Sequence, residues 1–466
     1  MRNIARIAVA LVVLADTGSA GQKSTESART TSIGADDVRP LWDLLWPHLP
    51  PELIDHPDDQ FDATWRAWVH RHDADIRSRV ARGDEDSLVN FWLFGTSFTD
   101  LPPARPLDVE ANGDGATLAQ VADRRLDDLL ERLARPGSNT RLRWAGELLR
   151  SRGIDPGAPD GRARVRTFLT GIGSRMVADN ARYDRALEAA RATGDPVAWI
   201  AATASLYRDR GLSSDTSMLS SFAIDATLER LVAEGTLETR PIRRVAIVGP
   251  GLDVFNKADG HDFYPIQSIQ PFALIDSLVR LGLSNIGDLS VTTFDVSASV
   301  NRHLTDAAAR ARAGDSYVVH LALGDADAWH AELLEYLAHA GSRIGQDVEP
   351  ARAPDAAGRV RVRAVRVRPD VVRTILPHDL NIVGQRLVLG EGERFDLVVA
   401  TNVFVYYARL EQALAVANLG SMLRSGGTLL ANQGVLPVVP MAPTFDQHTV
   451  VFSERQSDHV FRYRRE

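Results

Sequence analysis

The chain has 466 residues, more than one ordinary hydrophobic core accommodates, so we expect two domains. A formal net charge of −8 argues against nucleic acid as a partner. The absence of cysteine excludes disulfides, a catalytic thiol and thiolate metal sites. No run of about 18 apolar residues occurs, so no membrane span is expected beyond an N-terminal signal-like segment.

The first 37 residues have the composition of a targeting segment and a linker. Residues 1–20 resemble a short secretory signal, with a basic start, an apolar run at Ile7–Ala15 and small residues at Gly18–Ala20 for cleavage. The alternative is a frayed extension. Gly21–Asp37 is rich in Ser, Thr and Gly, which predicts a disordered linker.

The next part of the chain has mainly helical patterns. Leu118–Leu133 and Arg164–Arg191 are amphipathic and rich in charged pairs, which is typical of solvated helices. Met218–Glu234 predicts a further helix, leading directly into the first strand. The histidines are scattered without a His-Glu-x-x-His spacing, so no metal site is indicated.

These patterns divide the chain into three parts. We expect a signal-like segment and linker over 1–37, a helical domain over 38–235 and an α/β domain over 236–466. The short, charged stretch after Gly235 predicts a tight junction between the two domains rather than a flexible one.

A glycine-containing turn follows the first predicted strand, Val245–Val248. Gly249 and Gly251 allow the backbone to approach a ligand closely, and Asp253 comes next. Position 254 is Val, so the full Gly-x-Gly-x-x-Gly dinucleotide fingerprint is absent, which argues against NAD or FAD. The stretch from Val254 to Gln270 delays the next helix and is either a lid or a surface loop.

An acidic residue ends the second predicted strand, Leu289–Phe294. The carboxylate of Asp295 has two oxygens and can accept hydrogen bonds from both hydroxyls of a ribose. Alternatively, Asp295 caps the helix that begins near Ser297. Either role places this residue at the carboxyl edge of a parallel sheet.

The middle of the α/β part contains a strand at Tyr317–Leu323 and a helix at Asp327–Ala340. Val360–Arg368 alternates like a strand, but its arginines change parity at Ala364–Val365, which predicts a bulge or bend. The arginines fit a solvated edge strand or a phosphate site. Further on, Asp379 has the surroundings of a turn residue.

The clearest pattern is a β-α-β unit near the C-terminus. Phe395–Ala400 is an almost unbroken apolar strand, a helix with its apolar face over 410–423 follows, and Thr428–Ala431 is the second strand. Ligands of such sheets bind at the carboxyl ends of the strands, here at Thr401, Asn402, Tyr406 and Tyr407. Two final strands are expected at His448–Ser453 and His459–Arg464.

This unit resembles the fourth-strand segment of class I S-adenosylmethionine (SAM)-dependent methyltransferases, and is most similar to the chemotaxis-receptor (CheR-type) variant. The glycine turn, Phe-Asp-Val-Ser at 294–297 and Pro-His-Asp-Leu at 377–380 match the family in the right order. The resemblance implies an α/β, Rossmann-like seven-stranded SAM methyltransferase sheet that ends in an antiparallel pair. It implies SAM as cofactor, with Asp379 facing the adenine amino group, and a cofactor site of Gly249, Gly251, Asp253, Asp295, Asp379 and Asn402.

The resemblance assigns no general acid or base, because methyl transfer needs mainly orientation and exclusion of water. Asn402 and Tyr406 are the candidate substrate contacts, and Tyr264, Tyr406 and Tyr407 can steady a sulfonium charge. Thr401 replaces an Arg of the chemotaxis enzymes, so the methyl acceptor, a small molecule or a protein side chain, stays open. SAM is a cytosolic metabolite, which favours a cytoplasmic location. A non-catalytic Rossmann-like binding module and a nicotinamide-dependent oxidoreductase remain as alternatives.

Overall fold

The structure is a computed structural model that describes residues 29–54, 60–105, 115–194, 211–212, 218–237, 241–255, 261–324, 329–355, 359–436, 438 and 440–466. The signal-like segment 1–20, residues 21–28 of the predicted linker and the start of the predicted helix at Asp327 lie outside these residues. None of the described helices is both long enough and apolar enough to cross a membrane.

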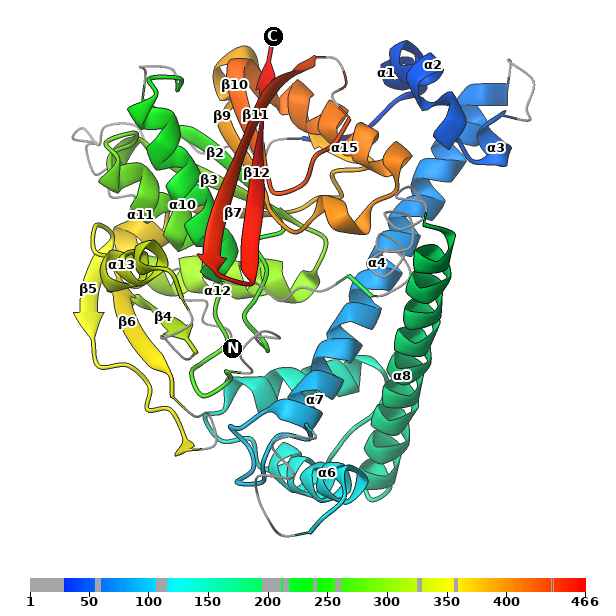
Figure 1. Ribbon diagram of the computed structural model, residues 1–466, viewed down its shortest axis with the longest axis vertical. Coiled ribbons are helices and arrows are strands. Elements are labelled where there is room, and N and C mark those ends of the chain that lie inside the picture. The colour runs from blue at the N-terminus through cyan, green and yellow to red at the C-terminus, as the bar shows by residue number, and fades with distance from the viewer. Residues whose placement is uncertain are drawn as a thin grey trace, which may run out of the picture.

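A seven-stranded sheet forms the centre of the fold, in the order β11-β12-β10-β9-β2-β3-β7 (Figure 1). Its strands are β2 (Arg244–Val248), β3 (Ser290–Asp295), β7 (Ile375–Asp379), β9 (Phe395–Ala400), β10 (Leu423–Ala431), β11 (Met441–Ser453) and β12 (Gln456–Arg465). The pairs from β10 through β9, β2 and β3 to β7 are parallel, whereas β12 runs antiparallel to both of its neighbours. The α/β class with a mainly parallel sheet is therefore confirmed.

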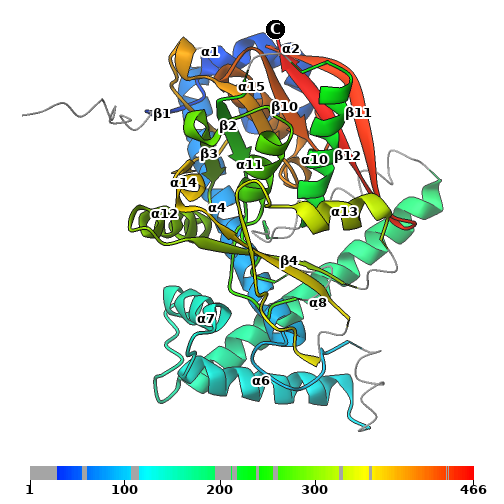
Figure 2. The same ribbon diagram turned by 90° about the vertical axis from the view of Figure 1, so that its left-hand side faces the viewer.

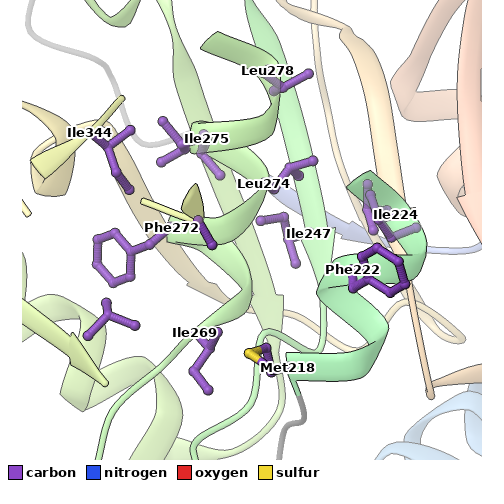
Figure 3. Close-up of a cluster of buried hydrophobic side chains, with 14 of the residues drawn as sticks. Met218, Phe222, Ile224, Ile247, Ile269, Phe272, Leu274, Ile275, Leu278 and Ile344 are labelled. Atoms are coloured by element: carbon purple, nitrogen blue, oxygen red, sulfur yellow. The ribbon is translucent and has the colours of Figure 1, made fainter. Parts of the chain in front are cut away.

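Both faces of the sheet are buried, which explains the unbroken apolar strands in the sequence. Along β2, Val245 and Ile247 point into one hydrophobic cluster, and Ala246 and Val248 point into another. The first cluster includes helices α10 (Met218–Ala233), α11 (Gln270–Arg280) and α12 (Ala298–Arg312). Figure 3 shows α10 and α11 side chains packed around Ile247 of β2 in this cluster.

The opposite face is covered by α15 (Arg409–Met422) and by the N-terminal segment of the chain. Thr30–Ser32 forms strand β1, which pairs antiparallel with β8 (Gln385–Leu387), and the Trp65 indole N–H donates to the buried Ile33 carbonyl at 2.9 Å. Residues 29–37 are therefore not the disordered linker that their polar composition predicts, because Ile33, Ala35 and Val38 anchor them on the sheet.

The described helices of the N-terminal part of the chain extend from this core. They are α1 (Ala35–Val38), α2 (Trp42–Leu45), α3 (Pro51–Ile54), α4 (Phe61–Phe94), α6 (Leu118–Ala134), α7 (Thr140–Ser151) and α8 (Gly161–Thr193). The distal half of α4 packs with α6, α7 and α8 in a third hydrophobic cluster. Figures 1 and 2 show α4 running from this helical bundle up to the sheet. We refer to α1 to α8 as the helical half; the domain limits at 37 and 235 stay predictions.

A small antiparallel sheet, β4-β6-β5, packs beside α11 and α13 (Ala331–His339). Its strands are β4 (Tyr317–Leu323), β6 (Arg361–Val367) and β5 (Gly345–Val348). The bulge predicted at Ala364–Val365 is wrong: both neighbours pair with β6 in continuous register. Ala364 and Val365 are both buried because the two faces of β6 are covered at that point.

Candidate functional site

A cleft lies where the carboxyl ends of β2, β3 and β9 meet. It encloses about 690 Å³ of space, open solvent included. Its lining comes from both halves of the chain and comprises Val80, Leu212, Ser220, Gly249, Gly251, Gln270, Asp295, Val296, Thr401, Asn402, Val403, Tyr406 and Tyr407. Seven residues that the sequence placed at a ligand site therefore meet here: Gly249, Gly251, Asp295, Thr401, Asn402, Tyr406 and Tyr407.

The glycine turn has a backbone that other residues rarely adopt. Gly249 and Gly251 both have φ of 64°. A Cβ at Gly249 would lie 2.9 Å from Val403 Cγ2, across the cleft floor. The Gly249 N–H donates to the Phe294 carbonyl at 2.8 Å, which joins the turn to the end of β3. Glycine is therefore needed at this position for conformation and for space.

Asp295 lies at the tip of β3 and connects the second strand to the glycine turn. Its Oδ1 accepts a hydrogen bond from the Ser297 N–H at 2.8 Å, and the backbone N–H groups of Gly251 and Val296 also donate to its carboxylate. Burial raises the pKa of Asp295 to about 7, although these three hydrogen bonds oppose the shift and the charge of Asp379 adds to it.

The alternative role of Asp295 as a helix cap is only partly met. Ser297 is the N-cap residue of α12, and its hydroxyl accepts from the Val300 N–H at 3.4 Å. Asp295 instead accepts a hydrogen bond from the backbone N–H of Ser297, the cap residue. The carboxylate keeps lone pairs for a further donor, since two carboxylate oxygens accept about four hydrogen bonds.

Asn402 is held in a left-handed conformation, with φ of 58°, and is the only non-glycine residue with positive φ among those the structure describes. Its backbone N–H donates to Asn432 Oδ1, and Asn432 Nδ2 donates back to Asn402 Oδ1, both at 2.7 Å. Asn402 Nδ2 donates to Ser220 Oγ at 2.8 Å. The amide that we expected to meet a ligand is thus largely engaged within the protein, which leaves one amide hydrogen for the cleft.

Gln270 and Ser220 contribute polar groups that the sequence did not indicate. Gln270 is the first residue of α11, and its Nε2 donates to Thr401 Oγ1 at 2.7 Å. Ser220 lies in the first turn of α10. Both residues lie near the start of helices with no motif of their own, so only the packing of those helices on the sheet could reveal them.

An apolar cluster forms the other part of the lining. Val80 of α4 and Leu212 pack with Val296, Tyr406 and Tyr407. Burial raises the pKa of the Tyr407 hydroxyl above its usual value, so this group stays protonated at neutral pH. The cleft therefore has an apolar end and a neutral polar end, and Asp295 is its single ionisable carboxyl among the lining residues that the structure describes.

Asp379 does not line the cleft. It pairs with Asp295 in register at the end of β7, but its carboxylate receives two hydrogen bonds from the Arg77 guanidinium, at 2.8 and 3.1 Å. Its side chain is 55% exposed. The role implied for Asp379 at the adenine amino group is thus not supported, because its side chain lies outside the cleft lining and pairs with Arg77 of α4.

Asp253 is also outside the cleft. It is buried, and its Oδ2 accepts from Gln267 Nε2 at 3.1 Å. Tyr264 is buried as well and stacks on His320, with ring centroids 5.4 Å apart, so it cannot face a sulfonium in the cleft. Contacts made with or within the insertion after the glycine turn hold both Asp253 and Tyr264 outside the site.

The described part of this insertion is neither a surface loop nor a lid on the cleft. The buried guanidinium of Arg141, on α7, donates to the carbonyls of Asp253 at 3.0 Å, Val254 at 2.5 Å, Asp262 at 2.9 Å and Tyr264. These contacts clamp the insertion between the helical half and the sheet. No group of three or more His, Cys, Asp or Glu side chains placed to hold a metal occurs in the described ranges.

Among solved structures, similarity is found to methyltransferases. The N-methyltransferase NodS from Bradyrhizobium japonicum WM9 is 12% identical over 52% of this chain and 94% of its own, with a TM-score of 0.26. Magnesium protoporphyrin IX methyltransferase from Synechocystis PCC 6803 with bound SAM is 12% identical over 53% of this chain and 81% of its own, also with a TM-score of 0.26. The glycopeptide N-methyltransferase MtfA is 13% identical over 51% and 68%, with a TM-score of 0.21.

Neither a family model nor a curated protein matches the chain.

Proposed function

We propose that this chain is a SAM-dependent methyltransferase whose cofactor binds in the cleft at the ends of β2, β3 and β9. The observation that carries the proposal is the meeting of a left-handed glycine turn and a buried acid in one cleft. The turn lets backbone approach the amino-acid part of the cofactor, and Asp295 accepts from the ribose hydroxyls.

The last two strands support the same class. The final strand, β12, lies antiparallel between β10 and β11. The sequence resemblance implied such a terminal antiparallel pair, and it distinguishes this sheet from that of a dehydrogenase. The CheR-type resemblance remains one of sequence. Where the chemotaxis enzymes have Arg, this chain has Thr401, whose hydroxyl accepts a hydrogen bond from Gln270. This position gives no reason to propose a glutamate side chain as the methyl acceptor.

A nicotinamide dinucleotide fits this cleft poorly. Its pyrophosphate would need a helix N-terminus directly after the glycine turn. Here Val254 replaces the third glycine and is buried, and the next described helix, α11, begins only at Gln270. In the part of the chain that the structure describes, no helix N-terminus directly after the turn offers its amides to a pyrophosphate.

The chemistry asks little of the side chains. SAM supplies a methyl group on a sulfonium, and an acceptor lone pair displaces it from the opposite side. The chain's contribution is to orient the two partners and to exclude water. The neutral polar end of the cleft, with Ser220, Asn402 and Thr401, is where we place the sulfonium and the acceptor, which is a small molecule or a protein side chain. We propose a cytoplasmic location, where SAM is made.

Calorimetric titration of the full chain with SAM, S-adenosylhomocysteine (SAH) and NADH tests the proposal. We expect saturable binding of SAM and SAH to one site per chain and none of NADH. Binding of NADH alone would favour the oxidoreductase. A folded chain that binds none of the three would leave the non-catalytic binding module.

A further inference from the structure

The apolar end of the cleft is built largely by residues far from the sheet in sequence. Val80 and Ile76, one helical turn apart on α4, form one cluster with Leu212, and Val296, Tyr406 and Tyr407 pack against it. Val80, Leu212 and Val296 all line the cleft. Val296 directly follows Asp295, so this apolar end begins beside the carboxylate.

Leu212 is fixed on α4 by close backbone contact. Its N–H donates to the Arg79 carbonyl at 2.8 Å. The preceding residue, Gly211, lies against Gly83: a Cβ at Gly211 would come within 2.3 Å of the Gly83 nitrogen, and a Cβ at Gly83 within 1.8 Å of the Leu212 carbonyl oxygen. Gly83 and Gly211 thus allow the backbone at Leu212 to approach α4 closely, which fixes Leu212 in the wall of the cleft.

Helix α4 is held over the strand ends by four polar contacts that surround Ile76 and Val80. His72 Nε2 lies 2.6 Å from Glu411 Oε1, and Asn381 Nδ2 donates to Asp73 Oδ1 at 3.0 Å. Arg77 binds Asp379, and Arg79 Nη2 donates to the Tyr406 carbonyl at 2.7 Å. These partners come from α15, from β7 and the loop after it, and from the loop after β9.

We propose that Val80 and Leu212, from the helical half, form one wall of the pocket for the adenine ring, so that the cofactor is held between the two halves of the chain. This inference rests on the proposed function. A ribose at Asp295 has the base on one side and the amino-acid part on the other. The polar end, with Gln270 bonded to Thr401 and Ser220 to Asn402, suits the charged amino acid, and the apolar end suits a flat ring.

This arrangement also determines how the adenine ring is recognised. Because Asp379 lies outside the cleft lining and pairs with Arg77, the ring is recognised by shape and by apolar contact with Val80, Leu212 and Val296 rather than by that carboxylate. Bound cofactor then adds contacts between α4 and the sheet. Val80 and Leu212 are specificity-determining residues that no local motif of the sheet encodes.

The test uses the full chain with methyl groups of Val and Leu isotopically labelled, and SAH as the probe. We expect nuclear Overhauser effects from the Val80 and Leu212 methyl groups to the adenine H2 or H8 protons of bound SAH. Loss of the corresponding cross-peaks in Val80→Ala and Leu212→Ala assigns them. Val177→Ala is the matched control, since Val177 on α8 belongs to the same helical half and is 69% exposed.

Affinity gives a second readout. Val80→Ala and Leu212→Ala each remove apolar contact with the ring, so SAH should bind roughly 3- to 10-fold more weakly, and Val177→Ala should leave binding unchanged. If SAH binds without nuclear Overhauser effects from Val80 and Leu212 to its adenine protons, and both variants bind it with wild-type affinity, the inference is wrong and the proposed function stands. A wild-type chain that does not bind SAH would overturn both.

Discussion

Replacement of Asp295 probes the cleft at its single ionisable carboxyl among the described lining residues. In the free protein the carboxylate already accepts from the N–H groups of Gly251, Val296 and Ser297. A carboxylate accepts about four hydrogen bonds, so at least one ribose hydroxyl can add a further bond. Hydrogen bonds to a charged acceptor contribute about 1.5–3 kcal/mol each, so Asp295→Ala should weaken SAM binding at least about tenfold. Asp295→Asn keeps the shape and one acceptor oxygen and should weaken binding less.

The pH dependence of binding gives a sharper form of the same experiment. The pKa of Asp295 is raised to about 7 in the free protein, and the ribose hydroxyls favour the ionised form. Affinity should therefore rise with pH, by up to about tenfold between pH 6 and 8. The amino group of SAM titrates nearby, at about 7.7–8.0, in any variant. The readout is thus the difference in the pH dependence of SAM affinity between wild type and Asp295→Asn, because the variant lacks the contribution of the Asp295 carboxyl.

Neither substitution should unfold the chain. The folded-state pKa of Asp295 lies above its unfolded value of 3.8, so the folded state holds the proton more tightly and loses stability as pH rises from about 4 to 7. A neutral Asn escapes this loss, so Asp295→Asn should melt at the same or a higher temperature than wild type at pH 8. Asp306→Ala, an exposed aspartate on α12, is the control and should change neither binding nor melting.

A ligand pair separates the ribose contact from support of the glycine turn. Wild type should prefer adenosine to 2′,3′-dideoxyadenosine in a calorimetric titration, and Asp295→Ala should lose that preference. Unchanged SAM affinity in Asp295→Ala, with wild-type binding established, would refute the assignment of this residue.

Three further substitutions test the surroundings of the cleft. Gly249→Ala should weaken SAM binding more than about tenfold, because its Cβ meets Val403 at a φ that alanine disfavours, whereas Gly287→Ala, with open space around it, should have no effect in the same titration. Asn432→Ala removes the two hydrogen bonds between Asn432 and Asn402, so it should weaken SAM binding in wild type but not in an Asn402→Gly background; equal effects in both would exclude the positioning role. Arg141→Met leaves four buried carbonyls without their donor and should lower the free energy of unfolding by about 3 kcal/mol or more in a denaturant titration, whereas Arg143→Met, exposed on the same helix, should change it by less than about 0.5 kcal/mol.

The strands with continuous apolar runs were predictable from the sequence. Phe395–Ala400 and Tyr317–Leu323 begin and end where the patterns place them. The edge strand β7 was missed because it is short and contains Pro377, which removes a backbone donor and reads as a turn. Such a strand is tolerated only at the edge of the sheet, and the sequence does not say which strand lies there.

The candidate site was predictable where strand ends supply it. Gly249, Gly251, Asp295 and Asn402 follow strands that meet at one edge, and all four line the cleft. Val80 and Leu212 were not predictable, since they reach the cleft only through the packing of α4 on the sheet. Asp253 and Asp379 were misplaced for the same reason, because each contacts an arginine far away in the sequence, Arg141 for Asp253 and Arg77 for Asp379.

A crystal structure of the chain with SAH tests the central claim most directly. The account predicts SAH in the cleft at the ends of β2, β3 and β9, with the Asp295 carboxylate within hydrogen-bond distance of both ribose hydroxyls and the adenine ring against Val80 and Leu212. SAH bound elsewhere on the chain, or in this cleft with its ribose turned away from Asp295, would contradict it.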